Sequence, residues 1–309
     1  MRFATARYDG AEVTGVVRDD RFHPVAGTLL ELVRAQRLPQ AGAAALADPG
    51  IRLENLQLRE PLQPPTIRDF VAFEEHVEGM TGGRVAPEWY AAPTFYFTNP
   101  YAITGPFDDV AIPPGCRKLD FELEVAAVIG RTGRDLTPEQ AREHIVGYTI
   151  FNDWSARDLQ SAEMKVGLGP AKGKDFATTL GPVLVTADEL DEHRDADGFL
   201  RLRMSASVNG ELIGHDLLSN MGWPFDELVA YASRGTEVRP GDVLGSGTCG
   251  NGGCLGELWG RADRADPPAL RPGDVVEMTV EGIGTIRNRV TAGTDPPPVR
   301  PARKRPRDR

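Results

Sequence analysis

Cysteine, histidine and long apolar segments are scarce in this sequence. Its 309 residues include three cysteines and five histidines. Three cysteines are too few, and odd in number, for a disulfide framework, so we expect a reducing, cytoplasmic environment. No run approaches the roughly 18 uncharged apolar residues that a transmembrane helix needs. The first residues, MRFATARYDGAEV, also lack the apolar core of a secretion signal, so neither a membrane partner nor a leader is expected.

Positive charge is scarce outside the C-terminus. The chain carries a net charge of −10, but residues 294–309 contribute +4, which leaves −14 on the rest. A folded body that binds nucleic acid needs a basic face, so a nucleic-acid partner is not expected. Residues 293–309 are rich in proline and arginine and have no apolar periodicity. This composition predicts a disordered, solvated tail, with a weak contact to an anionic partner as the alternative.

Turn signals divide the chain into a small N-terminal part and a larger part. Residues 1–62 contain patterns for a hairpin and a helix, which predict a small N-terminal α/β cap domain. The elements expected there are strands near Phe3–Arg7 and Glu12–Val17 around an Asp9-Gly10 turn, a helix near Leu29–Gln36 and a linker at Leu62–Pro65.

Residues 66–292 contain many short β-branched runs and few helical patterns, which predict a β-rich α+β domain. Two Arg-Pro-Gly-Asp segments, at 239–242 and 271–274, predict type II turns that enter hairpins. The expected strands lie near Thr94–Asn99, Phe121–Ile129, Tyr148–Phe151, Val183–Thr186, Leu200–Val208, Asp242–Leu244 and Val275–Val280. The expected helices are Pro138–Ile145 with Thr137 as its cap, Trp154–Met164 and Pro224–Ser233.

Three acidic residues alternate in the segment Lys118–Gly130. If this segment is one strand, Asp120, Glu122 and Glu124 project from the same face, because residues two apart lie on one side of a strand. Three like charges on one face repel one another unless solvent or a cation compensates them. The pattern is therefore compatible with an exposed acidic face or with a cation site.

The segment Thr149–Gln160 predicts an apolar strand that leads into a helix. Asp153 falls at the strand end or at the N-cap of the helix, and Arg157 and Gln160 follow four and seven residues later on one helix face. An ordinary cap, with Arg157 paired to Asp153, is one interpretation. The other is a functional junction, at which the framework holds these polar side chains rigidly.

Together, Glu122, Glu124 and Asp153 would offer three oxygen ligands. Such a hard, anionic set suits Mg²⁺, Mn²⁺ or Ca²⁺. Zinc is less suited, because histidines and cysteines do not cluster nearby, and the pair Cys249 and Cys254 is interpreted as incidental.

Among the histidines, His76 lies between acidic residues in the segment Arg68–Glu78. If this segment is helical, His76 falls seven residues after Asp69 and on the same face. A histidine can act as a base near neutral pH. A surface histidine among glutamates is the alternative.

The segment Gly245–Gly250 matches the pattern G-x-G-x-x-G. The glycine-rich residues that follow it do not favour a helix, so a dinucleotide site is not expected. A flexible loop whose backbone amides approach an anionic ligand is the remaining interpretation. The sequence contains no G-x-S-x-G segment, which leaves a serine hydrolase without support.

Four separated motifs between Thr66 and Val290 resemble, in order, those of the fumarylacetoacetate hydrolase family. They are Asp69…His76, Asp120-Phe-Glu-Leu-Glu124 before Val-Ile-Gly130, Asn152-Asp-Trp-Ser-Ala-Arg-Asp-Leu-Gln160, and Lys172-Gly-Lys174-Asp-Phe-Ala-Thr-Thr179. The Asn-Asp-Trp-Ser-Ala-Arg-Asp string is long and highly specific. The resemblance implies a mixed β-roll core, usually in a homodimer, with a divalent metal held by carboxylates and a small oxo acid as substrate.

The resemblance also implies roles for individual residues. The family's metal ligands are matched by Asp69, Glu122, Glu124 and Asp153, with Mg²⁺ expected first and Mn²⁺ or Ca²⁺ as alternatives. His76 matches a histidine that activates water, and Glu257 matches the glutamate that orients it. The residues expected to line the substrate pocket are Tyr96, Arg157, Gln160, Lys174 and Thr248.

Two positions depart from the hydrolases of the family. Val71 and Met164 stand where those enzymes have tyrosines that contact the substrate, so altered substrate contacts are expected. The leading hypothesis is metal-dependent cleavage of a C–C bond in a 1,3-dioxo acid, such as an acylpyruvate or a fumarylacetoacetate-like acid, with His76 deprotonating the attacking water. Decarboxylation, isomerisation or hydration of 2-oxo acids on the same site is the second hypothesis. A metal- or ligand-binding protein without activity is the third.

Overall fold

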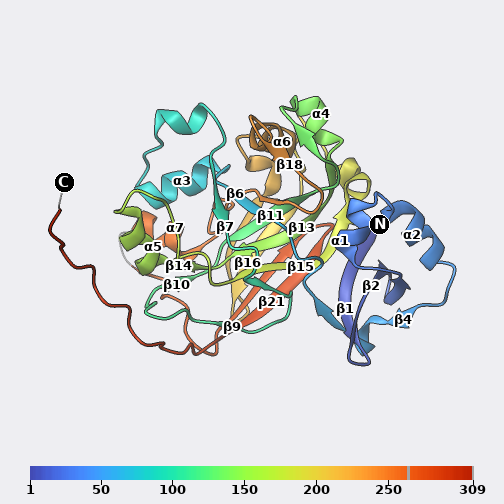
Figure 1. The fold of residues 1–309 in the computed structure, drawn as a ribbon, viewed down its shortest axis with the longest axis horizontal. Helices are drawn as coiled ribbons and strands as arrows, with labels where there is room; N and C mark the ends of the chain where they lie inside the picture. The colour runs from blue at the N-terminus through green and yellow to red at the C-terminus, as the bar shows by residue number, and fades with distance from the viewer. Residues whose placement is uncertain (263–264, 308–309) are drawn as a thin grey trace.

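A mixed sheet of twelve strands runs through the centre of the molecule (Figure 1). The computed structural model describes residues 1–262 and 265–307. The order along the sheet is β4-β3-β2-β1-β15-β13-β11-β19-β6-β7, with β5 paired to β1 and β8 paired to β15. The bounds of these strands are β1 Arg2–Tyr8, β2 Ala11–Arg18, β3 Arg21–Val25, β4 Ile51–Arg52, β5 Gln57–Arg59, β6 Ile67–Phe70, β7 Phe95–Thr98, β8 Ile103–Thr104, β11 Leu123–Ile129, β13 Ile145–Asp153, β15 Thr178–Thr186 and β19 Val243–Gly245.

A second sheet has five strands in the order β17-β16-β20-β21-β9, and its strand β21 contacts β13 and β15 of the first sheet. Two short ladders, β10 with β14 and β12 with β18, join segments outside these sheets. The bounds of these strands are β9 Val110–Ala111, β10 Leu119–Asp120, β12 Gly133–Arg134, β14 Ser155–Ala156, β16 Arg203–Val208, β17 Glu211–Leu217, β18 Glu237–Val238, β20 Val275–Val280 and β21 Gly284–Thr291.

Short helices surround the two sheets (Figure 1). Two helix pairs pack against each other, α3 with α7 and α4 with α6. The α-helices are α1 Leu29–Arg34, α2 Leu38–Ala45, α3 Glu74–Thr81, α4 Pro138–Arg142, α5 Arg157–Met164, α6 Phe225–Ala232 and α7 Leu255–Ala262. The 3₁₀ turns are Leu53–Asn55, Pro87–Tyr90, Ala187–His193 and Leu218–Asn220. The strand-rich mixture confirms the predicted β-rich α+β class.

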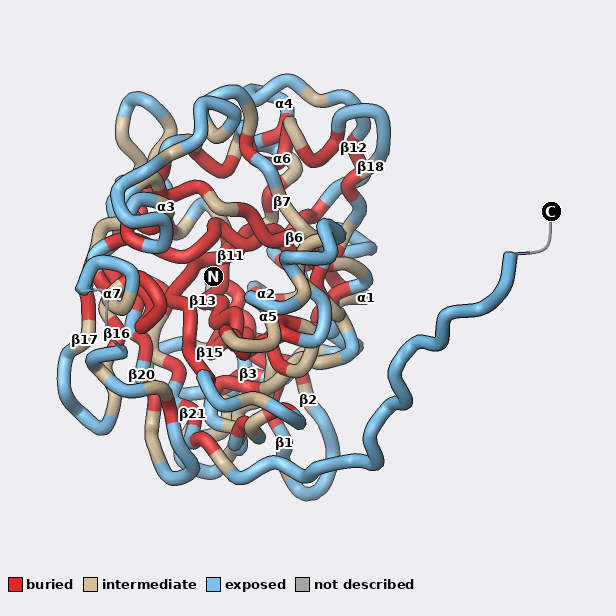
Figure 2. The backbone as a smooth tube through the Cα atoms, turned by 90° about the vertical axis from the view of Figure 1, so that its left-hand side faces the viewer, coloured by how far each residue is buried: buried red, intermediate tan, exposed pale blue. Residues whose placement is uncertain are grey.

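The strands β11 and β15 are buried along their whole length. Side chains that alternate along β11 enter two different apolar clusters. Val125 and Ala127 belong to one cluster, and Ala126 and Val128 belong to the other. A strand covered on both faces needs apolar residues at nearly every position, which explains its continuous Val/Ala/Ile run. Figure 2 shows these buried strands gathered in the middle of the molecule.

The N-terminal strands continue the central sheet, because β1 pairs antiparallel with β15. The predicted hairpin is confirmed as β1 and β2, and its turn residues Asp9 and Gly10 both have positive φ, at 47° and 79°. Two positive φ values suit the right-handed twist of the paired strands. Helix α1 begins at the predicted position, behind the Thr28 cap. The division of the chain at residues 62–66 stays a prediction.

Within residues 66–292, local sequence patterns predicted several individual elements correctly. Thr137 caps α4 through a capping box, as predicted, although the helix ends at Arg142 because β13 begins at Ile145. Both Arg-Pro-Gly-Asp segments form tight turns, in which Gly241 and Gly273 have φ of 94° and 99°. Proline followed by a glycine with positive φ is the type II arrangement that was predicted.

Residues 292–307 form no helix or strand and are exposed, and Figure 2 shows them leading away from the folded body. Disorder of this tail stays a prediction. Within the described part of the chain, every helix is too short or too polar to cross a membrane.

Candidate metal and catalytic site

Strand pairing brings the predicted carboxylates to one edge of the central sheet. Leu123, next to Glu124, pairs with Asn152, next to Asp153, because β11 and β13 run antiparallel. The first residues of β11 therefore lie beside the last residues of β13. On its other side, β11 pairs with β19, and β19 pairs in turn with β6. In the second of these pairs, Asp69 of β6 lies opposite Gly245 of β19.

Gly245 is required by this close packing rather than by a phosphate loop. A Cβ atom at this position would lie 2.4 Å from Asp69 Oδ1 and 3.0 Å from Glu124 Oε2. Any side chain would therefore push the two carboxylates apart. The first glycine of the predicted loop thus makes room for the acidic cluster, and the amide of Gly247 donates a hydrogen bond of 3.0 Å to Glu124 Oε2.

The strand predicted over Phe121–Ile129 is confirmed as β11 except for its first two residues, but the prediction that Asp120, Glu122 and Glu124 share one strand face is wrong. Strand β10 ends at Asp120 and β11 begins at Leu123. The Asp120 carboxylate accepts hydrogen bonds of 2.8 Å from Arg157 Nε and from the backbone amides of Leu255 and Gly256 at the start of α7. It is therefore held away from the neighbouring acidic residues. All three carboxylates are buried, at 0–4% exposure, so an exposed acidic face is also excluded.

Carboxylate oxygens of Asp69, Glu122 and Glu124 lie within 4.8 Å of one another. Asp153 joins them through Lys174, whose Nζ lies 2.5 Å from both Glu122 Oε2 and Asp153 Oδ2. Asp69 Oδ1 and Asp153 Oδ1 are buried without a hydrogen-bond partner. Buried carboxylate oxygens that lack partners are costly unless a cation balances them. Asp69, Glu122 and Glu124 are thus a hard oxygen donor set of the kind that suits Mg²⁺, Mn²⁺ or Ca²⁺, and Asp153 lies next to it through Lys174.

Crowding shifts the proton affinity of these groups in opposite directions. Burial, and then the charge of Asp153, raise the pKa of Asp69 well above its usual range. Burial and the neighbouring Asp69 do the same to the pKa of Glu124. Burial also acts to raise the pKa of Glu122, but Arg157 and Lys174 outweigh it and leave that pKa below its ordinary value. Without a cation, Asp69 and Glu124 therefore hold protons more strongly than isolated carboxyl groups do.

Cation affinity is expected to rise with pH. A cation must displace the protons that the raised pKa values keep on Asp69 and Glu124. Binding is therefore weaker at pH ~5 than at pH ~8, and it levels off once the pH exceeds the raised values. Isothermal titration of metal-free protein with Mn²⁺ across this range measures the effect. Equal affinity at both ends would contradict the assignment of these two carboxylates as ligands.

Arg157, the first residue of α5, forms ion pairs with two buried acidic residues. Its side chain is 8% exposed, with Nε 2.8 Å from Asp120 and Nη2 2.7 Å from Glu122. The predicted helix at Trp154–Met164 begins only at this residue, because Ser155 and Ala156 form β14. Gln160 lies one turn further and accepts a hydrogen bond of 3.2 Å from Arg157 Nη1, which places both on one helix face as predicted.

Replacing Arg157 with methionine is expected to destabilise the fold by about 3–5 kcal/mol, because it leaves buried carboxylates unpaired. Urea unfolding of the metal-free protein measures this loss. The matched control is Arg117→Met, which removes an ion pair to Asp158 from a side chain that is 89% exposed. That change should cost about 0–1 kcal/mol. Equal effects of the two substitutions would show that the Arg157 contacts do not stabilise the site.

His76 and Glu257 face each other across the packed helices α3 and α7. His76 Nδ1 lies 3.7 Å from Glu257 Oε2, and the two side chains are 8% and 0% exposed. Two glycines allow the helices to approach this closely. A Cβ on Gly79 would lie 2.2 Å from Glu257 Cγ, and a Cβ on Gly260 would lie 2.1 Å from the carbonyl oxygen of Gly79. Helix contact therefore sets the position of the pair.

The prediction that Asp69 and His76 share one helix face is wrong. Asp69 belongs to strand β6, and His76 belongs to helix α3, which begins only at Glu74. The alternative of a surface histidine is also wrong, since His76 is 7% exposed. His76 instead approaches the acidic cluster through Glu122, within 4.8 Å.

The remaining predicted substrate residues touch the carboxylates themselves. The Tyr96 hydroxyl, on β7, donates to Asp153. The Thr248 hydroxyl lies 3.4 Å from Glu124 Oε1. Burial, and then the charge of Asp153, raise the pKa of Tyr96 well above its usual range, so its hydroxyl keeps its proton. Both side chains are thus placed at the carboxylate cluster.

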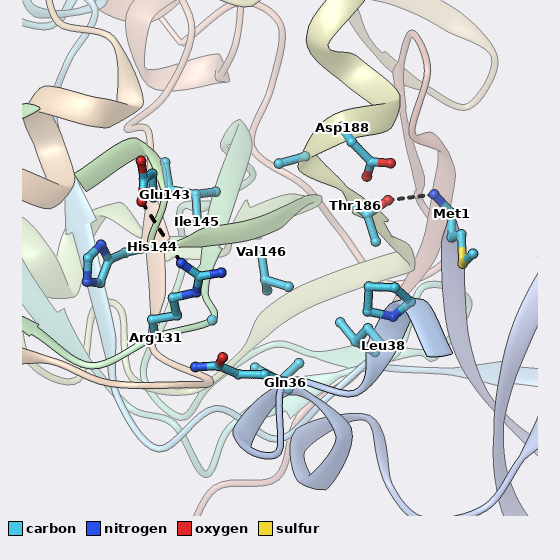
Figure 3. A pocket seen from close by; sticks show the side chains of 14 residues that line it. Met1, Gln36, Leu38, Arg131, Glu143, His144, Ile145, Val146, Thr186 and Asp188 are labelled. Carbon is cyan, nitrogen blue, oxygen red and sulfur yellow. Dashed lines mark hydrogen bonds and ion pairs between the residues drawn. The ribbon is translucent and has the colours of Figure 1, made fainter. Parts of the chain in front are cut away.

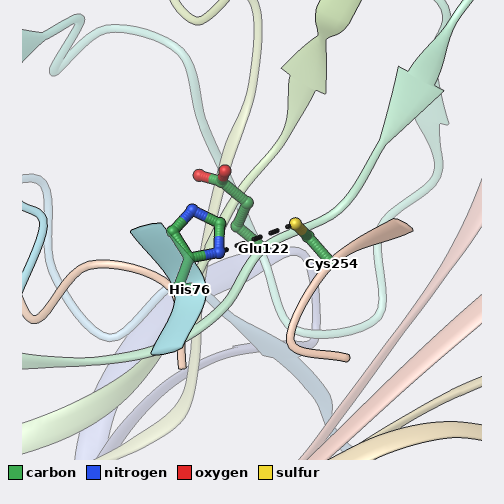
Figure 4. Close-up of side chains that lie close together, drawn as sticks. All are labelled: His76, Glu122 and Cys254. Atoms are coloured by element: carbon green, nitrogen blue, oxygen red, sulfur yellow. Dashed lines mark hydrogen bonds between the residues drawn. The ribbon is translucent and has the colours of Figure 1, made fainter. Parts of the chain in front are cut away.

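Cys254 is the residue of this region that the sequence analysis missed. Its Sγ lies 3.9 Å from His76 Nδ1 and accepts a hydrogen bond of 3.3 Å from the Glu257 amide. Figure 4 shows the imidazole of His76 close to both this thiol and the Glu122 carboxylate. The interpretation of the Cys249 and Cys254 pair as incidental stays a prediction, and the buried contact of Cys254 with His76 is the observation against it. The available signal was the position of Cys254 three residues before Glu257, one turn away at the start of α7.

A separate cavity of about 330 Å³ lies beside the N-terminal strand and helices (Figure 3). Its lining includes Met1, Leu38, Arg131, His144 and Thr186, and none of the predicted site residues. The chemistry-bearing side chains thus lie elsewhere, in the closed cluster at the sheet edge.

Fold and site together define an α+β protein with a buried carboxylate cluster flanked by a histidine. Residues 66–291 match the family model described as the fumarylacetoacetate (FAA) hydrolase C-terminal domain. The chain therefore belongs to the fumarylacetoacetate hydrolase family.

Relatives of this chain in the family are named after different activities. The mitochondrial oxaloacetate tautomerase fahd2 of Xenopus laevis is 36% identical over 191 residues, which are 61% of this chain and 55% of that protein. This chain thus matches about half the length of that relative. The oxaloacetate tautomerase YisK of Bacillus subtilis is 28% identical over 320 residues, which cover 94% of this chain and 100% of that protein. The solved fumarylacetoacetate hydrolase of Exiguobacterium antarcticum is 29% identical with a TM-score of 0.76, over 95% of this chain and 100% of that chain.

Proposed function

We propose that this chain is a divalent-cation-dependent enzyme that transfers a proton on a small 2-oxo acid, with keto–enol tautomerisation of an oxaloacetate-like dicarboxylate as its reaction. The observation that carries the proposal is the buried pair of His76 and Glu257 beside a cluster of four carboxylates. A base next to a cation site is the arrangement that such a proton transfer needs.

The bound cation would supply a Lewis acid that polarises the adjacent oxygens of the oxo acid. It would be held by Asp69, Glu122, Glu124 and Asp153, and we propose Mg²⁺ first. Glu257 Oε2 lies 3.7 Å from His76 Nδ1 and has no hydrogen-bond partner of its own, so a small approach would let it accept the Nδ1 proton and leave Nε2 as the base. That nitrogen takes a proton from the carbon beside the keto group, and the electrons of the broken C–H bond form the C=C bond while the C=O π electrons move onto the oxygen. The protonated His76 then gives the proton to this oxygen, which completes the enol and restores the neutral imidazole.

Basic and hydroxyl side chains hold the anionic substrate. Lys174 and Arg157 lower the negative charge of the cluster. Burial acts to lower the pKa of Lys174, but the charges of Asp153 and Glu122 outweigh it and raise that pKa, so Lys174 stays protonated. Tyr96 adds a hydroxyl at Asp153, and Gln160 adds an amide that contacts Arg157. The substrate is thus oriented by groups that leave His76 free to move the proton.

Hydrolysis of a C–C bond in an acylpyruvate-like acid is the second candidate. The same His76–Glu257 pair can deprotonate water, and the E. antarcticum relative bears the hydrolase name. Tautomerisation is placed first because it needs only the pair and the cation, and because two relatives are named oxaloacetate tautomerases. Hydrolysis also needs contacts to the distal half of the substrate, where Val71 and Met164 offer no hydroxyl and Met164 is 53% exposed.

Parallel assays on one preparation test the two candidates. Metal-stripped protein is re-supplied with Mg²⁺, Mn²⁺ or Ca²⁺ and given oxaloacetate or an acylpyruvate. Cation-dependent interconversion of keto and enol oxaloacetate, followed by enol absorbance, is the expected result. Release of pyruvate and a carboxylic acid from the acylpyruvate, without tautomerisation, would replace the first candidate with the second. Carbon dioxide from oxaloacetate would identify a decarboxylase, and no turnover with tight cation binding would favour a binding role. The homodimer and the cytoplasmic location stay predictions.

A further inference from the structure

We propose that His76, Cys254 and Glu122 form a second cation site, selective for a thiophilic ion such as Zn²⁺, beside the carboxylate centre. One ligand atom of each residue lies within 4.8 Å of the other two, and all three side chains are buried (Figure 4). A thiolate, an imidazole and a carboxylate are the three ligand types that zinc takes in proteins. Three protein ligands leave a fourth position open, as in zinc sites that bind water or a small ligand.

Three separate segments bring these ligands together. His76 lies on α3, Cys254 immediately precedes α7, and Glu122 lies in the break between β10 and β11. The Cys254 Sγ and His76 Nδ1 atoms are 3.9 Å apart. With ordinary Zn–S and Zn–N bond lengths and tetrahedral angles, two such ligands of one ion lie about 3.6 Å apart. A shift of a few tenths of an ångström therefore completes the pair, and binding releases the thiol proton to solvent.

Ligand softness separates this site from its neighbour. Oxygen-only ligands favour Mg²⁺, Mn²⁺ or Ca²⁺, whereas a thiolate favours zinc and other soft ions. Saturating Mg²⁺ therefore does not fill the thiol site, although both sites use Glu122.

Occupancy has a consequence that rests on the proposed function. An ion on Nδ1 of His76 displaces the contact with Glu257 and fixes the imidazole, so the base no longer accepts a proton from the substrate. Zinc at one equivalent is then an inhibitor in the presence of saturating Mg²⁺.

Cobalt absorption tests the site without any assay of activity. Metal-free full-length protein, saturated with Mg²⁺ and kept free of added thiols, is titrated with Co²⁺. The expected result is a sulfur-to-cobalt charge-transfer band in the near ultraviolet that saturates at one ion per chain. Cys254→Ser should abolish the band. Cys249→Ser should keep it, because Cys249 is equally buried but belongs to none of the candidate metal groups among the described residues.

A second variant keeps the test decisive if Cys254→Ser does not fold. His76→Gln retains the thiol and should weaken Co²⁺ binding by at least about tenfold, because one of three protein ligands is lost. The absence of a charge-transfer band in the unsubstituted protein, or an equal band in the Cys254→Ser protein, would overturn the proposal. If the protein shows the charge-transfer band but turns over none of the oxo acids, the second cation site is supported and the proposed function is rejected.

Discussion

Replacing His76 with alanine lowers turnover by about 10²–10⁴-fold and leaves Mn²⁺ binding at the carboxylate centre unchanged. The reason is that the imidazole is the base beside the cluster, while the four carboxylates that hold the cation are intact. Steady-state kinetics with saturating Mn²⁺ measure the first effect, and isothermal titration measures the second.

The control for this substitution is His215→Ala, which removes an exposed histidine on β17. It should leave both turnover and Mn²⁺ affinity at the level of the unsubstituted protein. Full turnover of the His76→Ala protein would show that another group moves the proton. Loss of Mn²⁺ binding in that variant would show instead that the histidine is a cation ligand.

Replacing Glu124 with glutamine lowers Mn²⁺ affinity by at least about 100-fold and abolishes turnover. The amide keeps the shape of the side chain, and its oxygen still accepts the hydrogen bond from the Gly247 amide. The substitution removes one negatively charged ligand from the carboxylate cluster. Because Glu124 is crowded by Asp69 and Glu122, the metal-free variant should unfold at the same temperature as the unsubstituted protein or a higher one.

Calorimetry of both proteins with and without Mn²⁺ measures these changes. The unsubstituted protein should gain thermal stability with Mn²⁺, because the ion binds only the folded state, and the Glu124→Gln protein should not. Glu277→Gln, at an exposed position of β20, is the matched control and should keep the full Mn²⁺ response. An unchanged Mn²⁺ response of Glu124→Gln would exclude the cluster as the cation site.

Elements governed by neighbours in the sequence were predictable from the sequence. The hairpin at Asp9 and Gly10, the Thr137 cap and the Arg-Pro-Gly-Asp turns each depend on the conformational preferences of two to four adjacent residues. These preferences act before any tertiary contact forms, which is why the local patterns were sufficient.

Elements governed by distant contacts were not predictable in the same way. The strand break after Asp120 follows from its bonds to Arg157 and to the amides of Leu255 and Gly256, up to 136 residues away. Cys254 reaches His76 across 178 residues through the packing of α3 on α7. Sequence spacing does not indicate either of these long-range contacts. The alternating acidic residues therefore suggested a single strand through Asp120, and Cys254 was interpreted as incidental.

The candidate site shows the same division. Spacing pointed to Glu122, Glu124 and Asp153 as a group of oxygen ligands, and the family resemblance added Asp69, His76 and Glu257. The structure brings the carboxylates together by pairing β13 with β11 and β6 with β19, and it places His76 and Glu257 beside them by packing α3 on α7. What neither source indicated is how tightly Lys174 bridges Glu122 and Asp153.

The most direct test of the metal-centre account is a crystal structure of the protein soaked with Mn²⁺ and oxalate, an inert acid with two adjacent oxygen pairs. The expected result is one anomalous Mn²⁺ peak among Asp69, Glu122, Glu124 and Asp153. Oxalate should lie on the ion between Lys174 and His76. An anomalous peak at any other place, or oxalate bound away from His76, would contradict the account.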